Sequence, residues 1–259
     1  MSLRCNNVGV SADGKKRLAQ VDATLVPGRF TAILGPNGAG KSTLMSLLTG
    51  QRQPMGGQVL LENRPLSTYS AADMATVRAV MLQESAVAFD FLVREVVELG
   101  RYPHRHRPTH DEAGLVQQAM EATQVEHLAD RNVTTLSGGE KARVQLARAL
   151  AQVWQPRPNG AERWLFLDEP TAALDLAHQH QVMRLLREWA TRERIGVVAV
   201  LHDVNLALRY VDDVLVLGGG AALFGPTHEV LHEQTLASVW GVASQAVSSE
   251  DGVRQYLFA

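Results

Sequence analysis

A glycine-rich octapeptide is the stretch of this chain best suited to chemistry. Its residues are Gly35, Pro36, Asn37, Gly38, Ala39, Gly40, Lys41 and Ser42. It lies between the apolar runs 30–34 and 43–48, which have the character of a strand and a helix. Glycines let backbone N–H groups converge on phosphate oxygens, and the helix start adds unpaired donors and a positive dipole end. The pattern predicts a phosphate-binding loop.

Three side chains at the end of this loop suit a bound nucleoside triphosphate. We expect Lys41 to reach the terminal phosphates, Ser42 to bind Mg²⁺ and Thr43 to join the phosphate contacts. The alternative is a glycine-rich turn that matches by chance. The strand before and the helix after are the context that the motif requires, so they favour the phosphate loop.

Two adjacent carboxylates, Asp168 and Glu169, form a second chemical feature. They follow the apolar run 164–167, which is typical of a central parallel strand covered on both faces. Such carboxylates emerge at the strand's C-terminal edge, where open α/β sheets bind ligands. Asp168 suits Mg²⁺, and Glu169 is placed to polarise a water. A structural pair without a ligand would be costly, so a nucleotide-hydrolysis site is predicted.

A second glycine-rich helix start lacks lysine. Its residues are Ser137, Gly138, Gly139 and Glu140, and an amphipathic stretch with Arg143, Leu146 and Leu150 follows. Its N–H groups and the Ser137 hydroxyl could bind another phosphate, or the segment could be only a capped helix N-terminus. The residues alone leave both possibilities open.

Composition places the chain among ordinary globular proteins. It has 259 residues, of which 46% are hydrophobic and 20% charged, enough for a sizeable core. A formal net charge of −2 gives no broad basic field, so we expect no nucleic-acid partner. The single cysteine, Cys5, fits a reducing compartment, the cytosol. No apolar run approaches the roughly 20 residues of a membrane span, and the N-terminus lacks a signal peptide's apolar core. Any membrane role is therefore expected to come through a partner.

The elements that must position these residues alternate between sheet and helix. Residues 3–34 are predicted to be β-rich, with turns at Asp13-Gly14 and Pro27-Gly28. Further strands are expected at 58–61, 79–82 and 197–201, and helices from Ser70 and over 176–191. Residues 155–160 are predicted to form a surface loop, and 214–224 a terminal hairpin.

Between about 91 and 151 the hydrophobic period becomes helical. Val93, Val96, Val97 and Leu99 are predicted to share one buried face. The loop 101–108 holds histidines that could suggest a metal site, but its prolines and arginines favour a solvated or partner-facing loop.

With these residues in view, the chain resembles the ATP-binding subunits of ATP-binding-cassette (ABC) transporters over nearly its whole length. Six motifs occur in family order: Walker A at 35–42, the Q-loop at Gln83, the signature at 136–140, Walker B at 165–169, the D-loop at 173–175 and the switch histidine at His202. The resemblance implies an α/β P-loop NTPase cassette: a RecA-like core, an antiparallel β subdomain and an inserted helical subdomain near 91–151, within one domain spanning 1–259.

The resemblance also implies roles that spacing alone does not. Two subunits would pack head to tail and hold two ATP molecules between one chain's phosphate loop and the other's signature. His202 would contact the γ-phosphate, Gln83 would sense that phosphate and Mg²⁺, and Asp175 would link the two sites. The plainer alternatives are a strand-capping histidine and helix N-capping by Asp175. Lys41, Mg²⁺ and helix N-termini would stabilise developing charge, with Glu169 as the base.

One position departs from the family pattern. Members usually place an aromatic residue early in the first strands to stack on adenine, and our alignment puts Ala12 there. No Tyr, Phe or Trp occurs before Phe30. Base stacking and base selectivity are therefore expected to differ from those of family members with an aromatic residue at this position.

Within the family, residues 83–103 resemble importers of iron chelates, cobalamin and haem. The insert 156–160 favours the haemin import type, with ferric siderophore or cobalamin as the alternative cargo. This implies a transmembrane permease, a periplasmic or surface substrate-binding protein, and a peripheral position on the cytoplasmic face of the cell membrane. An exporter ATPase is opposed by residues 83–103, and a soluble ABC ATPase of DNA repair or translation by the single phosphate loop and the absence of heptads.

Overall fold

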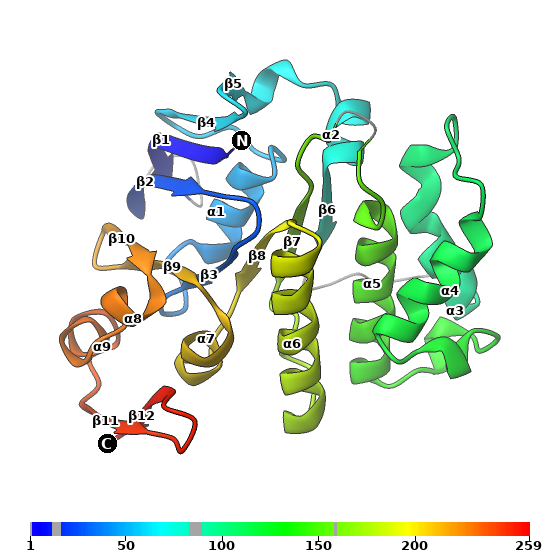
Figure 1. Ribbon diagram of the computed structural model, residues 1–259. Coiled ribbons are helices and arrows are strands. Elements are labelled where there is room, and N and C mark those ends of the chain that lie inside the picture. Colours follow the sequence, from blue (N-terminus) through cyan, green and yellow to red (C-terminus); the bar gives the residue numbers. More distant parts are fainter. Residues whose placement is uncertain (1, 12–16, 83–89, 158–159) are drawn as a thin grey trace.

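A mixed six-stranded sheet runs through the centre of the protein (Figure 1). The computed structural model describes residues 2–11, 17–82, 90–157 and 160–259. The strand order is β10 (Ala221–Pro226), β9 (Asp213–Gly218), β3 (Phe30–Leu34), β8 (Gly196–Val200), β7 (Trp164–Asp168) and β6 (Arg78–Met81). All neighbours are parallel except β10, which returns antiparallel to β9. The predicted α/β class is confirmed.

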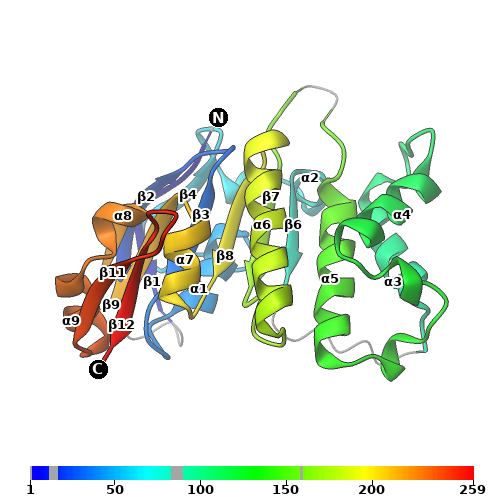
Figure 2. The same cartoon turned by 60° about the horizontal axis from the view of Figure 1, so that its bottom comes forward.

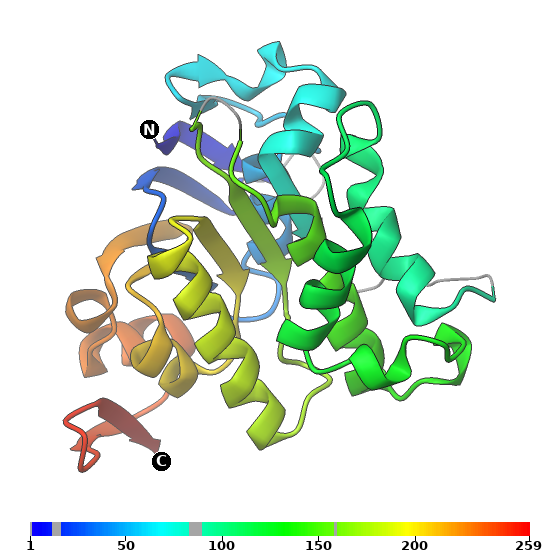
Figure 3. The ribbon, with the colours of Figure 1, turned by 45° about the vertical axis from the view of Figure 1, so that its right-hand side comes forward.

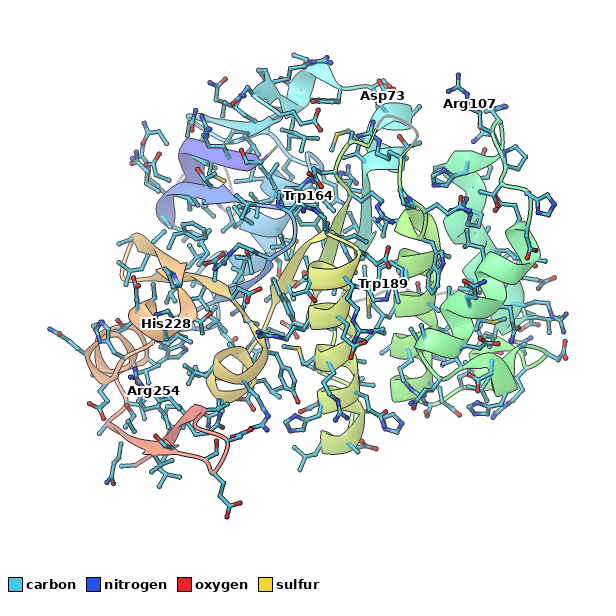
Figure 4. The ribbon with its side chains drawn as sticks, viewed as in Figure 1. Asp73, Arg107, Trp164, Trp189, His228 and Arg254 are labelled. Atoms are coloured by element: carbon cyan, nitrogen blue, oxygen red, sulfur yellow. The ribbon has the colours of Figure 1, made fainter. Side chains whose placement is uncertain are left out.

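The apolar strands of this sheet are buried because their alternate side chains enter two different cores. Leu165 and Leu167 of β7 face the core under α5 (Gly138–Val153) and α6 (Leu176–Arg192). Trp164 and Phe166 face the opposite core, with α1 (Lys41–Leu48) (Figure 4). Covering both faces explains why this strand has no polar alternation.

A separate antiparallel sheet packs over α1. Its order is β2 (Ala19–Leu25), β1 (Leu3–Val10), β4 (Gln58–Leu61) and β5 (Arg64–Pro65). The predicted turn at Pro27-Gly28 and the strand 58–61 are confirmed, and Asp13-Gly14 lies outside the described residues. A 3₁₀ turn (Leu66–Thr68) and α2 (Ala71–Val77) lead to β6, and Ser70 caps α2 by accepting from Asp73 N at 3.1 Å. This is the expected antiparallel β portion of a cassette.

Helices occupy the described residues from Val93 to Val153 and form their own apolar cluster (Figure 3). They are α3 (Val93–Glu98), a 3₁₀ segment (Leu99–His104), α4 (Glu112–Ala122), the 3₁₀ turns Glu126–Leu128 and Val133–Thr135, and α5. Val93, Val96 and Val97 are buried as predicted, but Leu99 is 50% exposed. The prediction for Leu99 was wrong because α3 ends before it, and the 3₁₀ turn rotates its side chain outward.

The prediction that the loop 101–108 is wholly solvated or partner-facing was wrong for Arg101. Its side chain is 7% exposed, and its Nε donates to Glu112 Oε2 at 2.7 Å. Its Nη1 donates to the carbonyl of Ala151 at 2.7 Å. His104 Nε2 lies 2.9 Å from the carbonyl of Gln152, and burial lowers the pKa of this imidazole. These two side chains join the 3₁₀ segment to α4 and α5.

The hairpin over 214–224 is confirmed as β9 and β10, but its terminal position was wrong. β9 pairs with β3 in the central sheet, and four elements follow β10. They are α8 (Thr227–Val230), α9 (Glu233–Trp240), β11 (Ser244–Ser248) and β12 (Arg254–Phe258). Figure 2 shows the last two strands as a hairpin beside α7 (Val204–Tyr210). Nothing in residues 227–259 was predicted, because short elements with weak periodicity leave little signal.

In the described part of the chain, no helix has both the length and the apolarity of a membrane span.

Candidate nucleotide site

The glycine-rich loop turns from β3 into α1 at the C-terminal edge of the sheet. Gly35 has a φ of 149°, and a Cβ atom there would lie 2.2 Å from the carbonyl oxygen of Leu217. Gly40 is the N-cap of α1 with a φ of 97°, and no side chain caps this helix. Only glycine suits these two positions, and the uncapped helix start leaves backbone donors for an anion.

The side chain of Lys41 is folded against this loop. It is 7% exposed, and its Nζ donates to the carbonyl oxygens of Gly35 at 2.9 Å and Pro36 at 3.1 Å. Burial lowers the pKa of this ammonium group, and the carboxylates of Glu169 and Asp168 oppose the shift. The lysine is therefore held at the mouth of the loop, where phosphate oxygens can replace the carbonyls as its partners.

Asp168 and Ser42 face each other across the edge of the sheet. The Ser42 hydroxyl lies 3.5 Å from Asp168 Oδ1, and Asp168 is 7% exposed. Burial raises the pKa of this carboxyl group, and the Ser42 hydroxyl opposes the shift. A buried carboxylate beside a hydroxyl is an oxygen donor set that suits a hard divalent cation. A bound cation would also remove the cost of burying this charge.

Glu169 follows Asp168 in a left-handed backbone conformation, with a φ of 54°. Its Oε1 lies 2.6 Å from Nε2 of His202. His202 comes two residues after β8, and β7 and β8 are parallel neighbours, with Asp168 opposite Val200. A non-glycine residue in this conformation carries strain of the kind that is concentrated at functional sites. The sheet thus brings together the carboxylate and the histidine.

The second glycine-rich segment begins α5. Ser137 is the N-cap: its hydroxyl accepts from Glu140 N at 3.2 Å, and Glu140 Oε2 accepts from Ser137 N at 2.7 Å. Of the two predicted possibilities, phosphate binding and a capped helix N-terminus, this capping box is the second. A Cβ atom on Gly139 would lie 3.1 Å from the carbonyl oxygen of Ala173, so this segment packs against 173–174.

Asp175 also caps a helix. Its Oδ1 accepts from His178 N at 2.9 Å at the start of α6, and this hydrogen bond lowers the pKa of the exposed carboxyl group. Within one chain, Asp175 therefore acts as a helix N-cap, the plainer of its two predicted roles.

Asp203, which sequence reasoning did not single out, caps α7 directly after His202 by accepting from Asn205 N and Leu206 N. An aspartate before an apolar helical stretch is the signal that predicts such a cap.

Comparison with known proteins places this geometry in a family. Residues 18–172 match the family described as "ABC transporter". The chain belongs to the ABC transporter family. Its fold is that of an ABC cassette, and it is an ATP-binding ATPase.

Relatives of this ABC ATPase cover most of its length. It is 43% identical over 240 residues to "Hemin import ATP-binding protein HmuV" of Escherichia coli O157:H7, covering 92% of each chain. It is 46% identical over 222 residues to the protein of the same name from Gloeobacter violaceus, covering 85% of this chain and 80% of that one. Among solved structures, a metal-chelate type ABC transporter in an inward-facing conformation has a TM-score of 0.80 and 26% identity, covering 100% of this chain and 97% of that one.

Two positions that the family resemblance singled out lie outside the described residues. They are Gln83 of the Q-loop and Ala12 at the adenine-stacking position. Arg17 is described, and its Nη1 donates to Gln20 Oε1 at 2.7 Å on the surface. The roles of Gln83 and Ala12 stay predictions.

Proposed function

We propose that this ABC ATPase powers the import of haem (haemin) through a separate membrane permease. The observation that carries the proposal is identity of 43% and 46% to proteins named for hemin import, over most of both chains. The structural relative of the metal-chelate type fits haem and also the alternative cargoes, a ferric siderophore or cobalamin. Both cargoes use the same ATPase chemistry.

The proposed hydrolysis uses the groups at the edge of the sheet. Lys41 and the N-terminus of α1 bind the phosphates of ATP, and Ser42 and Asp168, with Gln83, would hold Mg²⁺. When bound, Mg²⁺ neutralises charge on the phosphate oxygens. Glu169 takes a proton from the water that attacks the γ-phosphorus, and His202 orients this carboxylate and contacts the γ-phosphate. ADP and inorganic phosphate leave.

Each proposed site is shared between two copies in a head-to-tail dimer. Ser137 and Asp175 are exposed at the starts of α5 and α6, where a second copy can reach them. The family resemblance implies that Ser137 binds the partner's nucleotide and that Asp175 links the two sites. Capping within one chain leaves the remaining N–H groups of α5 for the partner's γ-phosphate. The proposed dimer closes when ATP fills both sites.

The proposed permease contact is the surface from Gln83 to Arg107, of which the structure describes residues 90–107. Phe91, Leu99 and Tyr102 are exposed apolar side chains there, and the Arg105 guanidinium lies 4.1 Å from the Tyr102 ring centre. Figure 4 shows Arg107 at the outer edge of the helices. Exposed apolar side chains with arginines nearby in the same segment suit a short amphipathic helix of a membrane protein. The ATPase would then lie on the cytoplasmic face of the membrane, with a substrate-binding protein on the other side.

Reconstitution with the permease and its substrate-binding protein in vesicles tests the cargo. ATP-dependent accumulation should be greatest for haemin when haemin, a ferric siderophore and cobalamin are supplied separately. The same vesicles with Glu169→Gln should accumulate none of them. Uptake of siderophore or cobalamin without haemin would overturn the cargo and retain the ATPase. Uptake of haemin that persists with Glu169→Gln would overturn the proposed mechanism.

A further inference from the structure

The helix that follows His202 is too short to fix its own position. α7 has seven residues, and isolated helices of this length are unstable in water. Its placement must come from tertiary contacts, and His202 lies between this helix and the end of β8. The described contacts lie on several sides. Apolar residues of α7 pack in the core against β3 and beside α8, and hydrogen bonds join α7 to the C-terminal hairpin β11–β12 and to helix α6.

Asn205 joins α7 to the hairpin through both ends of its side-chain amide. Its Nδ2 donates to the carbonyl of Tyr256 at 3.0 Å, and its Oδ1 accepts from Tyr256 N at 2.8 Å. One residue of β12 thereby exchanges two hydrogen bonds with a side chain, as it would with an opposing residue of an antiparallel strand. Replacing Asn205 leaves both backbone groups of Tyr256 without these partners.

The hairpin is itself anchored, so it can act as a support. Tyr256 is 3% exposed, and its hydroxyl donates to the carbonyl of Leu231 at 3.0 Å, at the end of α8. A surface ion pair between Arg209 and Asp251, at 2.6 Å, adds a second link between α7 and the hairpin. Exposed pairs of this kind contribute little, so the Asn205 bonds are the stronger connection.

The far end of α7 is tied to α6, which begins at Asp175. The hydroxyl of Tyr210 lies 2.8 Å from His180 Nδ1, and Arg187 donates to the carbonyl of Tyr210 at 2.9 Å. α7 therefore lies between a helix that begins at the D-loop and a hairpin from the last residues of the chain. A shift of the hairpin would move α7 relative to the edge of the sheet.

We propose that the C-terminal hairpin sets the position of His202 against Glu169, with Asn205 as the positioning residue. Only two residues separate Asn205 from His202. β8 holds the chain before His202 and α7 holds it after, so the His202–Glu169 distance of 2.6 Å depends on both. Displacements of about 1 Å in such a constellation lower rates by up to about 100-fold. The inference rests on the proposed role of His202 in hydrolysis.

Steady-state ATP hydrolysis by the full-length chain, with its permease, tests this inference. Asn205→Ala should lower kcat by about 10- to 100-fold and change the KM for ATP by less than about twofold, because the phosphate loop is untouched. Gln245→Ala, on the exposed face of β11, is the matched control and should behave as the native protein. Asn205→Asp keeps the acceptor for Tyr256 N and should give an intermediate kcat. If the alanine variant does not fold, the kcat of Asn205→Asp is the measurement that tests the inference.

A thermodynamic cycle with His202→Ala distinguishes positioning from general support of the fold. If Asn205 acts through His202, Asn205→Ala should have almost no further effect on kcat in the His202→Ala background. An equal loss in both backgrounds, or a parallel loss of ATP binding, would overturn the inference. If His202→Ala itself leaves hydrolysis at the native rate, the proposed function of His202 fails, and the inference with it. A slow His202→Ala with a native-like Asn205→Ala would overturn the inference alone.

Discussion

Nε2 of His202 lies 2.6 Å from Oε1 of Glu169, although the two residues are 33 positions apart in the chain. The contact forms because β7 and β8 are parallel neighbours whose C-terminal ends meet at one edge. The left-handed backbone of Glu169, with a φ of 54°, is strained, and strain of this kind persists only where the surroundings support it. The proposed base is therefore held in place by the proposed γ-phosphate contact.

Glu169→Gln should retain ATP binding and lose nearly all hydrolysis. The amide keeps the size of the side chain and its contact with His202 but is no base, so kcat should fall by about 100-fold or more. Size-exclusion chromatography with ATP should show a dimer. Glu121→Gln, which alters an exposed carboxylate of α4, serves as the control and should elute and hydrolyse as the native chain. A purely monomeric elution or near-normal turnover of Glu169→Gln would contradict the assignment.

Mixing two inactive variants tests whether each site is shared. Lys41→Ala should weaken ATP binding because it removes a charge-assisted phosphate contact, and Ser137→Arg should bind ATP but block closure. The second change also removes the cap of α5, which costs about 1 kcal/mol of stability, so thermal unfolding should verify a folded chain. A mixed dimer contains one intact composite site, and the mixture should regain part of the hydrolysis. No recovery between two folded variants would argue against shared sites.

The parts of the fold that the sequence predicted are those set by local patterns. β4 spans Gln58–Leu61 as expected, because Gly56-Gly57 ends the preceding segment and an apolar run follows. The apolar run from Trp164 predicted a strand covered on both faces, since only such a strand can lack polar alternation. The motifs at the ends of these strands predicted that the phosphate loop and Asp168 lie at one edge of the sheet, but the contact between Glu169 and His202 was not predicted.

The missed features depend on contacts between segments far apart in the chain. Arg101 looked like a solvated arginine, but its partners Glu112 and Ala151 reach it only after α4 and α5 pack together. The support of α7 by the hairpin has the same origin, because Asn205 and Tyr256 are 51 residues apart. No short pattern marks either pair.

Charge reversal should separate the arginines of the proposed permease contact from the buried one. Arg105→Glu and Arg107→Glu should reduce uptake by the assembled transporter while the isolated subunit hydrolyses ATP at its native rate, because both residues are exposed. Arg101→Glu should lower the thermal unfolding temperature, because it places a carboxylate beside Glu112 in a buried contact. Uptake and hydrolysis assays check the Arg105 and Arg107 variants, and thermal unfolding checks the Arg101 variant. Equal loss of both activities in the Arg105 or Arg107 variant would show that these residues support the catalytic fold.

The Arg101–Glu112 pair predicts a change of stability with acid. The Arg101 guanidinium, through its hydrogen bond, lowers the pKa of Glu112 from its ordinary 4.5 to about 2. A carboxyl group with a depressed native pKa stabilises the fold fully above its unfolded pKa and loses that contribution as pH falls through the native one. The difference in unfolding free energy between the native chain and Glu112→Gln should therefore be constant above pH 4.5 and shrink toward pH 2. Denaturant titrations at several pH values measure it, and a difference that does not change with pH would contradict the pairing.

The remaining prediction concerns the base of the nucleotide. The family resemblance predicts that Ala12 takes the position where members usually have an aromatic residue, and stacking on such a residue is worth roughly 1–3 kcal/mol by analogy with nucleic-acid sites. Arg17 or Lys16 could partly cover the ring through a guanidinium or an aliphatic stem. Without an aromatic ring at this position, the triphosphate contacts of the phosphate loop are expected to dominate the affinity.

GTP should therefore compete with ATP within about one decade of affinity, since the loss of base stacking removes about one to two decades of base-dependent binding. Ala12→Tyr should tighten ATP binding if this position faces the adenine. Ala12→Leu is the matched control, because it adds apolar volume without a π-face and should give a smaller gain. Equilibrium affinities for both nucleotides decide the question. Strong preference for ATP in the native chain, together with no gain from Ala12→Tyr, would mean that another part of the protein holds the base and that Ala12 is not the stacking position.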